Sequence, residues 1–261
     1  LVQVTFGALT ALALRRMVGR RYGPRAGLAA AAFFAACQML VSAVYSAYIT
    51  LAVCCYLALT TDAFLRWLAG PERSRRHWLI TAGICAGLAA ATKYSGIAFV
   101  WLPAGLAVLI FSVWGRRPSK RVLINGAIFG GTALLVFMPW MVKNFAYTRN
   151  PTYPLLYSVF DGKHWSPRRN AKWQQAHMPG PVRPIPAAKQ LWRLLIAGPT
   201  DLETGPHEGE FVSALAILFI PMLLLRPRRR DESSDEQPRR MPVLLVMDVY
   251  LCLCVVVGCL N

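Results

Sequence analysis

Acidic residues are scarce in this 261-residue sequence, and charged residues of both signs make up only 16% of it, against 56% hydrophobic residues. The 12 Asp and Glu residues stand against 29 Lys and Arg residues, so the formal net charge is +17. A soluble domain carries roughly 25% charged residues. A nucleic-acid-binding protein would also be basic, but it would not place its charges between apolar runs long enough to cross a bilayer. The composition therefore excludes both classes and indicates an integral membrane protein whose first partner is the lipid bilayer.

Cysteine and histidine are present but lack the spacing of a disulfide framework or a metal site. All seven cysteines lie in apolar stretches, where thiols usually act as small hydrophobic side chains. They are Cys37, Cys54, Cys55, Cys85, Cys252, Cys254 and Cys259. The four histidines are His77, His164, His177 and His207. No pair of these residues has the spacing of metal ligands, so the sequence predicts no metal-binding residue.

Long apolar runs are abundant, and many have the roughly 17–25 residues that a membrane-spanning helix needs. Candidate spans lie near 1–14, 27–44, 46–67, 78–92, 96–114, 122–142, 210–225 and 242–260. The predicted fold class is therefore all-α, a polytopic transmembrane helix bundle of about eight spans. The sequence opens and closes inside an apolar run, so we expect the first and last spans to be truncated and at least one span to precede Leu1.

The basic residues between these spans predict the orientation of the bundle. Nineteen of the 29 Lys and Arg residues lie in four segments, 15–25, 66–76, 116–121 and 226–240. Eight spans threaded in order put all four segments on one side of the membrane, which the positive-inside rule makes cytoplasmic. The predicted organisation is six helices over 1–142, an outward periplasmic loop over 143–209 and two helices over 210–261 that flank the basic linker 226–240.

Smaller patterns predict how the helices pack. Gly83 with Gly87, and Gly126 with Gly130, are small-xxx-small pairs that let helices approach closely in lipid. Asp62 lies one helical turn before Arg66, so an ion pair between them accounts for this acidic residue near the end of its span.

The outward loop is rich in proline and aromatic residues, and we expect a short helix in the plane of the interface near 187–196. It also carries basic residues, which run against the usual charge bias of an outer face. They are Lys143, Arg149, Lys163, Arg168, Arg169, Lys172, Arg183, Lys189 and Arg193. Two interpretations stay open, namely a site for an anionic ligand such as a lipid phosphate and an ordinary solvated basic loop.

Two stretches carry a resemblance. The first reads Gly87-Leu-Ala-Ala-Ala-Thr-Lys-Tyr-Ser-Gly96, and the second reads Pro139-Trp-Met-Val-Lys-Asn-Phe-Ala-Tyr-Thr-Arg-Asn-Pro-Thr-Tyr-Pro154. Together, in this order and at outward helix ends, they resemble the dolichyl-phosphate-mannose protein mannosyltransferase-like superfamily, in particular its bacterial membrane glycosyltransferases. The resemblance covers about residues 10–226.

The resemblance implies a glycosyltransferase of the C-type fold in the bacterial inner membrane. Such an enzyme transfers a sugar from a polyprenyl-phosphate carrier at the outer leaflet to an acceptor in the extracytoplasmic space. Its expected catalytic carboxylate, an Asp in the first outward loop, would precede Leu1. The sequence also departs from the pattern at Thr50, where relatives often carry Asp. The family allows a divalent metal, and the sugar and acceptor are not specified.

Position along the helix adds a physical reason to consider Lys93. A helix that starts at Trp78 reaches Lys93 after roughly 22 Å at 1.5 Å per residue, short of a hydrocarbon core of about 30 Å. Lys93 is therefore expected at or just below the outer boundary, where it could pair with a carrier phosphate or snorkel to the headgroups. The candidate residues for donor binding are Lys93, Tyr94, Lys143, Asn144 and Tyr153. Asn144 has the alternative role of capping a helix end.

Three other functions stay open on sequence grounds. A secondary transporter or a lipid-linked flippase would also be polytopic, although transporters often show repeated halves and neither motif recurs here. A degenerate, non-catalytic membrane subunit of the same family is the third.

Overall fold

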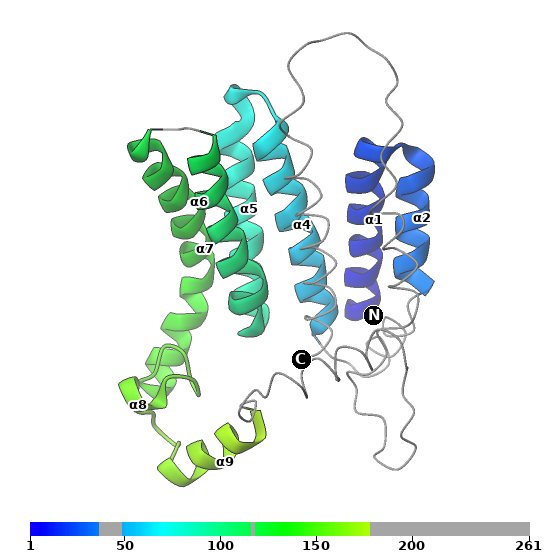
Figure 1. Cartoon of the computed structure of the whole chain (residues 1–261). Coiled ribbons are helices and arrows are strands. Elements are labelled where there is room, and N and C mark those ends of the chain that lie inside the picture. Colours follow the sequence, from blue (N-terminus) through cyan, green and yellow to red (C-terminus); the bar gives the residue numbers. More distant parts are fainter. Residues whose placement is uncertain (37–48, 116–117, 178–261) are drawn as a thin grey trace, which may run out of the picture.

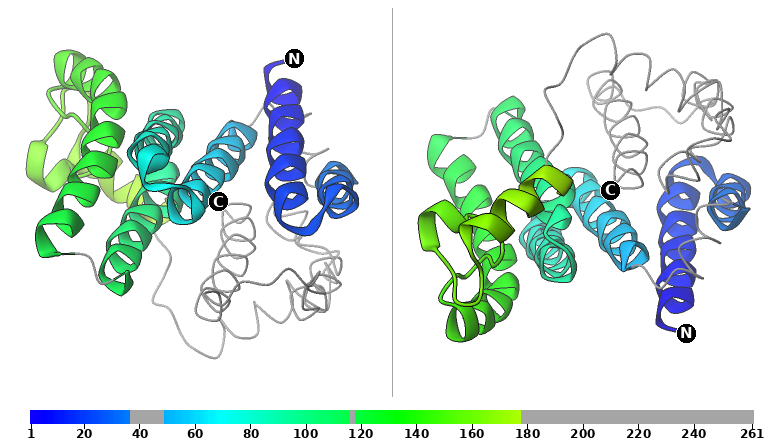
Figure 2. Two further views of the ribbon diagram at one scale, coloured as in Figure 1. Left: turned by 90° about the horizontal axis from the view of Figure 1, so that it is seen from above. Right: turned by 90° about the horizontal axis from the view of Figure 1, so that it is seen from below.

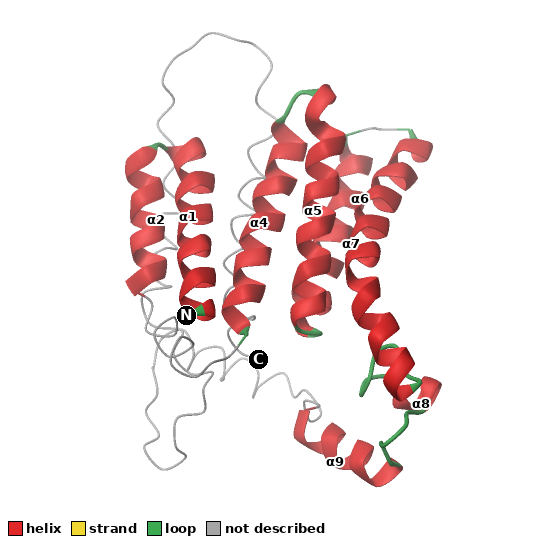
Figure 3. Ribbon diagram, turned by 180° about the vertical axis from the view of Figure 1, so that it is seen from behind, coloured by secondary structure: helices red, strands yellow, loops and turns green. Residues whose placement is uncertain are grey.

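The computed structural model describes residues 1–36, 49–115 and 118–177. Within these ranges every regular element is a helix (Figure 3), which confirms the predicted all-α bundle. The helices are α1 (Val2–Tyr22), α2 (Pro24–Ala36), α4 (Thr50–Ala69), α5 (Glu72–Thr92), the π-helical turn η1 (Ile97–Trp101), α6 (Leu102–Trp114), α7 (Ser119–Thr148), α8 (Tyr157–Phe160) and α9 (Pro167–His177). The predicted spans 210–225 and 242–260, the linker 226–240 and the interfacial helix near 187–196 lie outside the described residues.

The long helices stand side by side and alternate in direction (Figure 1). The α1–α2, α4–α5 and α6–α7 turns lie at one end of the bundle, which we call the arginine end because three of the four predicted basic segments belong to these turns. The start of α4, the turn between α5 and η1, and helices α8 and α9 lie at the other end, the loop end. These three basic segments thus lie at a single end, as their predicted common side of the membrane requires, and the fourth, 226–240, lies outside the described residues.

Viewed from above, the described helices follow one another in a row of contacts (Figure 2). Helix α1 packs on α2 and α4, α4 packs on α5, and α5 packs on α7, which also contacts α6. Helix α5 therefore lies between α4 and α7, and both sides of the turn that follows it have a neighbouring helix.

Three of the described helical segments are long and apolar enough to cross a membrane, namely Thr50–Ala69, Ile97–Trp114 and Ser119–Thr148. Helices α1 and α5 match two further predicted spans, but each includes arginines that reduce its apolar length. The segment 15–21 continues α1 instead of forming a linker, because arginine is a good helix former and the single Gly19 within this segment does not interrupt the helix. Gly23 then ends the helix with a φ of 97°, a value that favours glycine.

Helix α7 is longer than its predicted span 122–142, because it continues to Thr148. Arg149 is the C-cap of α7 and has the left-handed conformation (φ 64°). Its amide donates a hydrogen bond to the Phe145 carbonyl oxygen. Lys143 and Asn144 therefore lie on the last turns of a helix and not in an irregular loop.

Close approach between α5 and α7 depends on the predicted glycine pair. A Cβ added at Gly83 would lie 2.6 Å from the Phe129 carbonyl oxygen, and one at Gly87 would lie 2.5 Å from that of Ala133. No side chain fits at either position, so the pair brings the two backbones together as expected. In the second pair, Gly126 faces the Leu109 side chain of α6, whereas Gly130 has nothing within 4 Å.

Charged contacts join three helices near the arginine end. The predicted Asp62–Arg66 ion pair is present at 3.0 Å, and Arg20 of α1 also pairs with Asp62. The Arg66 guanidinium lies over the Trp78 ring of α5, 4.3 Å from its centroid. The Asp62 carboxylate therefore connects α1 to α4 by ion pairs, which explains an acidic residue near the end of this span.

Candidate functional site

The turn 93–96 sends the adjacent side chains of Lys93 and Tyr94 toward two different helices, which pack on opposite sides of α5. Lys93 ends α5 in an extended conformation (φ −153°, ψ 139°), in which successive side chains point to opposite sides. Gly96 closes the turn by donating its amide to the Lys93 carbonyl oxygen at 2.8 Å. A Cβ at Gly96 would lie only 2.3 Å from the Ala89 carbonyl oxygen, so the tight return onto α5 requires glycine. As a result Lys93 lies against α4, whereas Tyr94 reaches α7.

The Tyr94 hydroxyl is the centre of a hydrogen-bonded cluster at the loop end. It accepts a hydrogen bond from Asn144 Nδ2 at 2.9 Å and one from Trp140 Nε1 at 3.3 Å. It donates to the Tyr153 carbonyl oxygen at 3.0 Å. Burial raises the pKa of Tyr94 above its usual value, which keeps the phenol protonated and able to donate. Two of the predicted candidates, 50 residues apart in the sequence, thus meet directly.

Lys143 joins this cluster indirectly. Its ammonium lies over the Trp140 ring, 4.8 Å from the centroid, while the Trp140 indole donates to Tyr94. The Lys143 side chain is exposed, so the cation is held at the surface of the cluster and is available to an anion there.

Tyr153 takes part through its backbone rather than its phenol. Its carbonyl oxygen accepts the Tyr94 hydrogen bond, and its ring packs edge-on against Trp165 with centroids 5.5 Å apart. The sequence placed Tyr153 in the site, but the structure gives its side chain a packing role in the loop that follows α7.

Asn150 fixes that loop onto the end of α7. Its side chain is fully buried, with 0% exposed surface. Its Nδ2 donates to the carbonyl oxygens of Leu155 (2.9 Å) and Asp161 (3.0 Å), and its Oδ1 accepts from the amide and hydroxyl of Thr152. The single amide thus holds both ends of the segment 152–161, which includes Tyr153.

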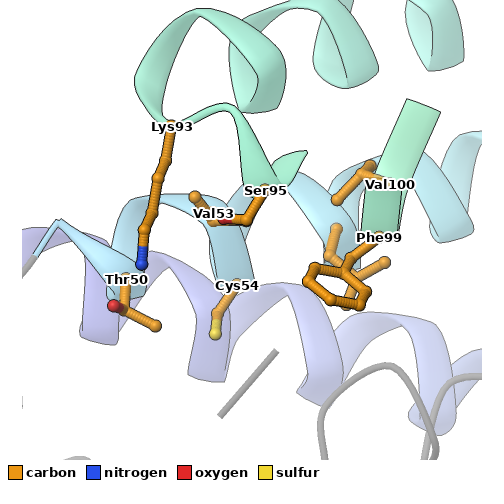
Figure 4. A pocket seen from close by; sticks show the side chains of 8 residues that line it. Thr50, Val53, Cys54, Lys93, Ser95, Phe99 and Val100 are labelled. Atoms are coloured by element: carbon orange, nitrogen blue, oxygen red, sulfur yellow. The ribbon is translucent and has the colours of Figure 1, made fainter. Parts of the chain in front are cut away.

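Lys93 lies in a separate pocket between the start of α4 and the turn (Figure 4). Its side chain extends along the pocket toward Thr50, the first residue of α4. The lining residues are Thr50, Val53, Cys54, Leu57, Lys93, Ser95, Phe99 and Val100. The polar groups come from Thr50, Lys93 and Ser95, and the remaining wall is mostly apolar. Such a lining suits an amphipathic ligand with an anionic end.

The five predicted site residues therefore separate into two groups. One group is the cluster at the end of α7, formed by Tyr94, Asn144, the Tyr153 backbone and, through Trp140, Lys143. The other is Lys93, which faces α4. Both groups lie at the loop end. Among the described residues, no three His, Cys, Asp or Glu side chains gather in the manner of metal ligands.

Sequence reasoning missed Trp140 and Asn150 as individual site residues, although both belong to the second motif. Asn150 follows the end of α7 in a polar loop, and no local sequence pattern predicts that its side chain is buried. Thr50 was noted only as a departure from the family pattern, yet it lies beside Lys93.

Comparison with known proteins identifies a family for the N-terminal half of the chain. Residues 1–142 match the family described as Dolichyl-phosphate-mannose-protein mannosyltransferase. No match was found among curated proteins or among solved structures. The matched region includes α1, α2, α4, α5, η1, α6, most of α7 and the Lys93 pocket. The chain belongs to the dolichyl-phosphate-mannose-protein mannosyltransferase family and is thus an integral membrane protein of the glycosyltransferase class.

Proposed function

We propose that the full-length protein transfers a sugar from a polyprenyl-phosphate carrier to an acceptor on the extracytoplasmic side of a bacterial inner membrane. The observation that carries this proposal is the Lys93 pocket, because it combines a cation with an apolar wall at the loop end of the bundle. The concentration of arginines at the opposite end supports an outward position for the loop end.

The two chemically different parts of the carrier would lie along the mouth of the pocket, because the enclosed space of about 10 Å³ has room for little more than one water. The phosphate would contact Lys93, with Thr50 and Ser95 as hydroxyl donors, and the first isoprene units would lie along Val53, Leu57 and Phe99. A lysine at this depth has a long apolar stem that packs along such a wall while the ammonium reaches the headgroup level.

In the proposed reaction the bond between the anomeric carbon and the phosphate oxygen breaks as the acceptor oxygen bonds to that carbon. The acceptor proton goes to a base, which the family pattern expects to be a carboxylate. The lipid phosphate leaves with an additional negative charge, and a nearby cation lowers the barrier by stabilising that charge. Lys93 would supply this cation.

The Tyr94 cluster would orient the donor or the acceptor next to the pocket. Its tryptophan and tyrosine rings offer apolar faces to a sugar, and Lys143 offers a second cation at the surface. Because Lys93 and Tyr94 are adjacent residues of the turn 93–96, this turn holds both the Lys93 pocket and the Tyr94 cluster in position.

The test is a transfer assay with the full-length protein reconstituted in vesicles. Radiolabelled sugars are presented either on polyprenyl phosphate or as nucleotide sugars, with a cell-envelope extract as the acceptor. We expect label transfer from the lipid-linked donors alone. Transfer from a nucleotide sugar in the absence of any lipid carrier would contradict the proposed donor class.

A further inference from the structure

A second cavity lies at the arginine end, far along the bundle from the Lys93 pocket. It is a groove between the C-terminal half of α1, the start of α2 and the end of α4. Its lining residues are Leu12, Arg15, Arg16, Gly19, Arg20, Pro24 and Arg66. The donor site proposed above uses none of them.

The charge balance of this groove is strongly positive. Four guanidinium groups line it, and the carboxylate in contact with them is that of Asp62, which pairs with Arg20 and Arg66. Glu72, the first residue of α5, is paired with Arg75 and Arg121 instead. Arg15 and Arg16 are exposed, and within the described part of the chain neither forms an ion pair. The groove is therefore complementary to an anion.

The surface of α1 changes from apolar to cationic along its length. Leu9 and Leu12 are 46% and 51% exposed, and Arg16 follows Leu12 one helical turn later. In a bilayer, the leucines would contact acyl chains and the arginines would lie at headgroup level. A free phosphate or a nucleic acid would use only the cationic part of this surface, whereas a phospholipid would use both parts.

Two glycines shape the groove. Gly19 has no side chain to fill it, and Gly27 of α2 approaches the Gly19 backbone so closely that a Cβ at Gly27 would lie 2.8 Å from the Gly19 Cα. The α1–α2 hairpin is therefore closely packed, and the guanidinium groups of α1 lie beside this contact.

We propose that this groove binds the headgroup of an anionic phospholipid, with the phosphodiester at Arg15 and Arg16 and the acyl chains along Leu9 and Leu12. Arg20 and Arg66 contribute to the positive field while remaining paired with Asp62. Bound lipid would bridge the α1–α2 hairpin to α4 and stabilise their packing at the arginine end.

The experiment measures thermal stability of the purified full-length protein in neutral detergent. Phosphatidylglycerol is added in mixed micelles, with phosphatidylcholine and inorganic phosphate as separate additions. We expect phosphatidylglycerol alone to raise the Tm in a saturable manner. Each interfacial arginine contributes about fivefold to the affinity for anionic lipid, so R15Q/R16Q should weaken the apparent affinity about thirtyfold.

Two further variants separate lipid binding from folding and from total charge. R15K/R16K keeps both positive charges and should retain most of the affinity. R168Q/K172Q removes two exposed charges from α9 at the loop end and should leave the affinity unchanged. The proposal is overturned if phosphatidylcholine or inorganic phosphate stabilises the protein equally, or if R15Q/R16Q and R168Q/K172Q bind phosphatidylglycerol alike.

Discussion

Replacement of Lys93 by alanine in the full-length protein is expected to lower the rate of sugar transfer by about 10²–10³-fold, the effect of removing one group that stabilises developing charge in a transition state. The physical reason is that the leaving phosphate gains negative charge in a pocket whose wall is largely apolar. The measurement is the initial rate of transfer from a polyprenyl-phosphate sugar at saturating donor.

Two companion variants make this result specific. Lys93→Arg keeps the positive charge and is expected to restore at least part of the rate, which a purely steric role of Lys93 would not produce. Lys120→Ala removes an exposed lysine in the first turn of α7, at the arginine end, and should leave transfer unchanged. Wild-type rates in a well-inserted Lys93→Ala protein would remove Lys93 from the site.

Replacement of Asn150 by alanine is expected to destabilise the loop after α7 by about 2–4 kcal/mol, because one buried amide makes several hydrogen bonds and leaves its partners unpaired when removed. The amides of Thr152 and Lys163 report on this loop, since the first donates to Asn150 Oδ1 and the second to the Thr148 carbonyl oxygen. Their hydrogen exchange should become about thirtyfold to a thousandfold faster.

The helix bundle should be unaffected by this substitution, so exchange in α4 and α5 serves as an internal reference. Asn170→Ala is the matched control, because Asn170 Oδ1 accepts a single long hydrogen bond of 3.4 Å from Trp165. If Asn150→Ala and Asn170→Ala changed exchange in the loop equally, Asn150 would not be the residue that fixes it. Because Tyr153 lies in the same loop, we also expect Asn150→Ala to lower transfer activity.

The membrane-spanning pattern was predictable because bilayer thickness imposes one length scale on every span. Residue composition also located Gly83 and Gly87 as a contact, since only small residues allow helix backbones to approach this closely. The ends of α1 and α7 were less predictable. Arginine is tolerated within helices and at headgroup level alike, so a basic run does not mark where a helix stops.

Contacts between distant segments explain the remaining differences. The sequence identified Tyr94 and Asn144 through separate motifs, but their hydrogen bond depends on the packing of α5 on α7. It grouped Lys93 with Tyr94, whereas the extended backbone at Lys93 sends the two side chains to different helices. The burial of Asn150 depends on a loop that folds back to Asp161, which no local pattern encodes.

The most direct test of the central claim is the side of the membrane to which each end of the bundle belongs. Single cysteines are introduced at Ile49 and Val159 at the loop end and at Arg73 and Lys120 at the arginine end, all four exposed, in a protein whose seven native cysteines are replaced. A membrane-impermeant maleimide applied to intact cells should label Ile49→Cys and Val159→Cys, and it should label the other two only after permeabilisation. Reaction of Ile49→Cys and Val159→Cys from opposite sides would contradict a common outward site for Lys93 and the Asn150 loop.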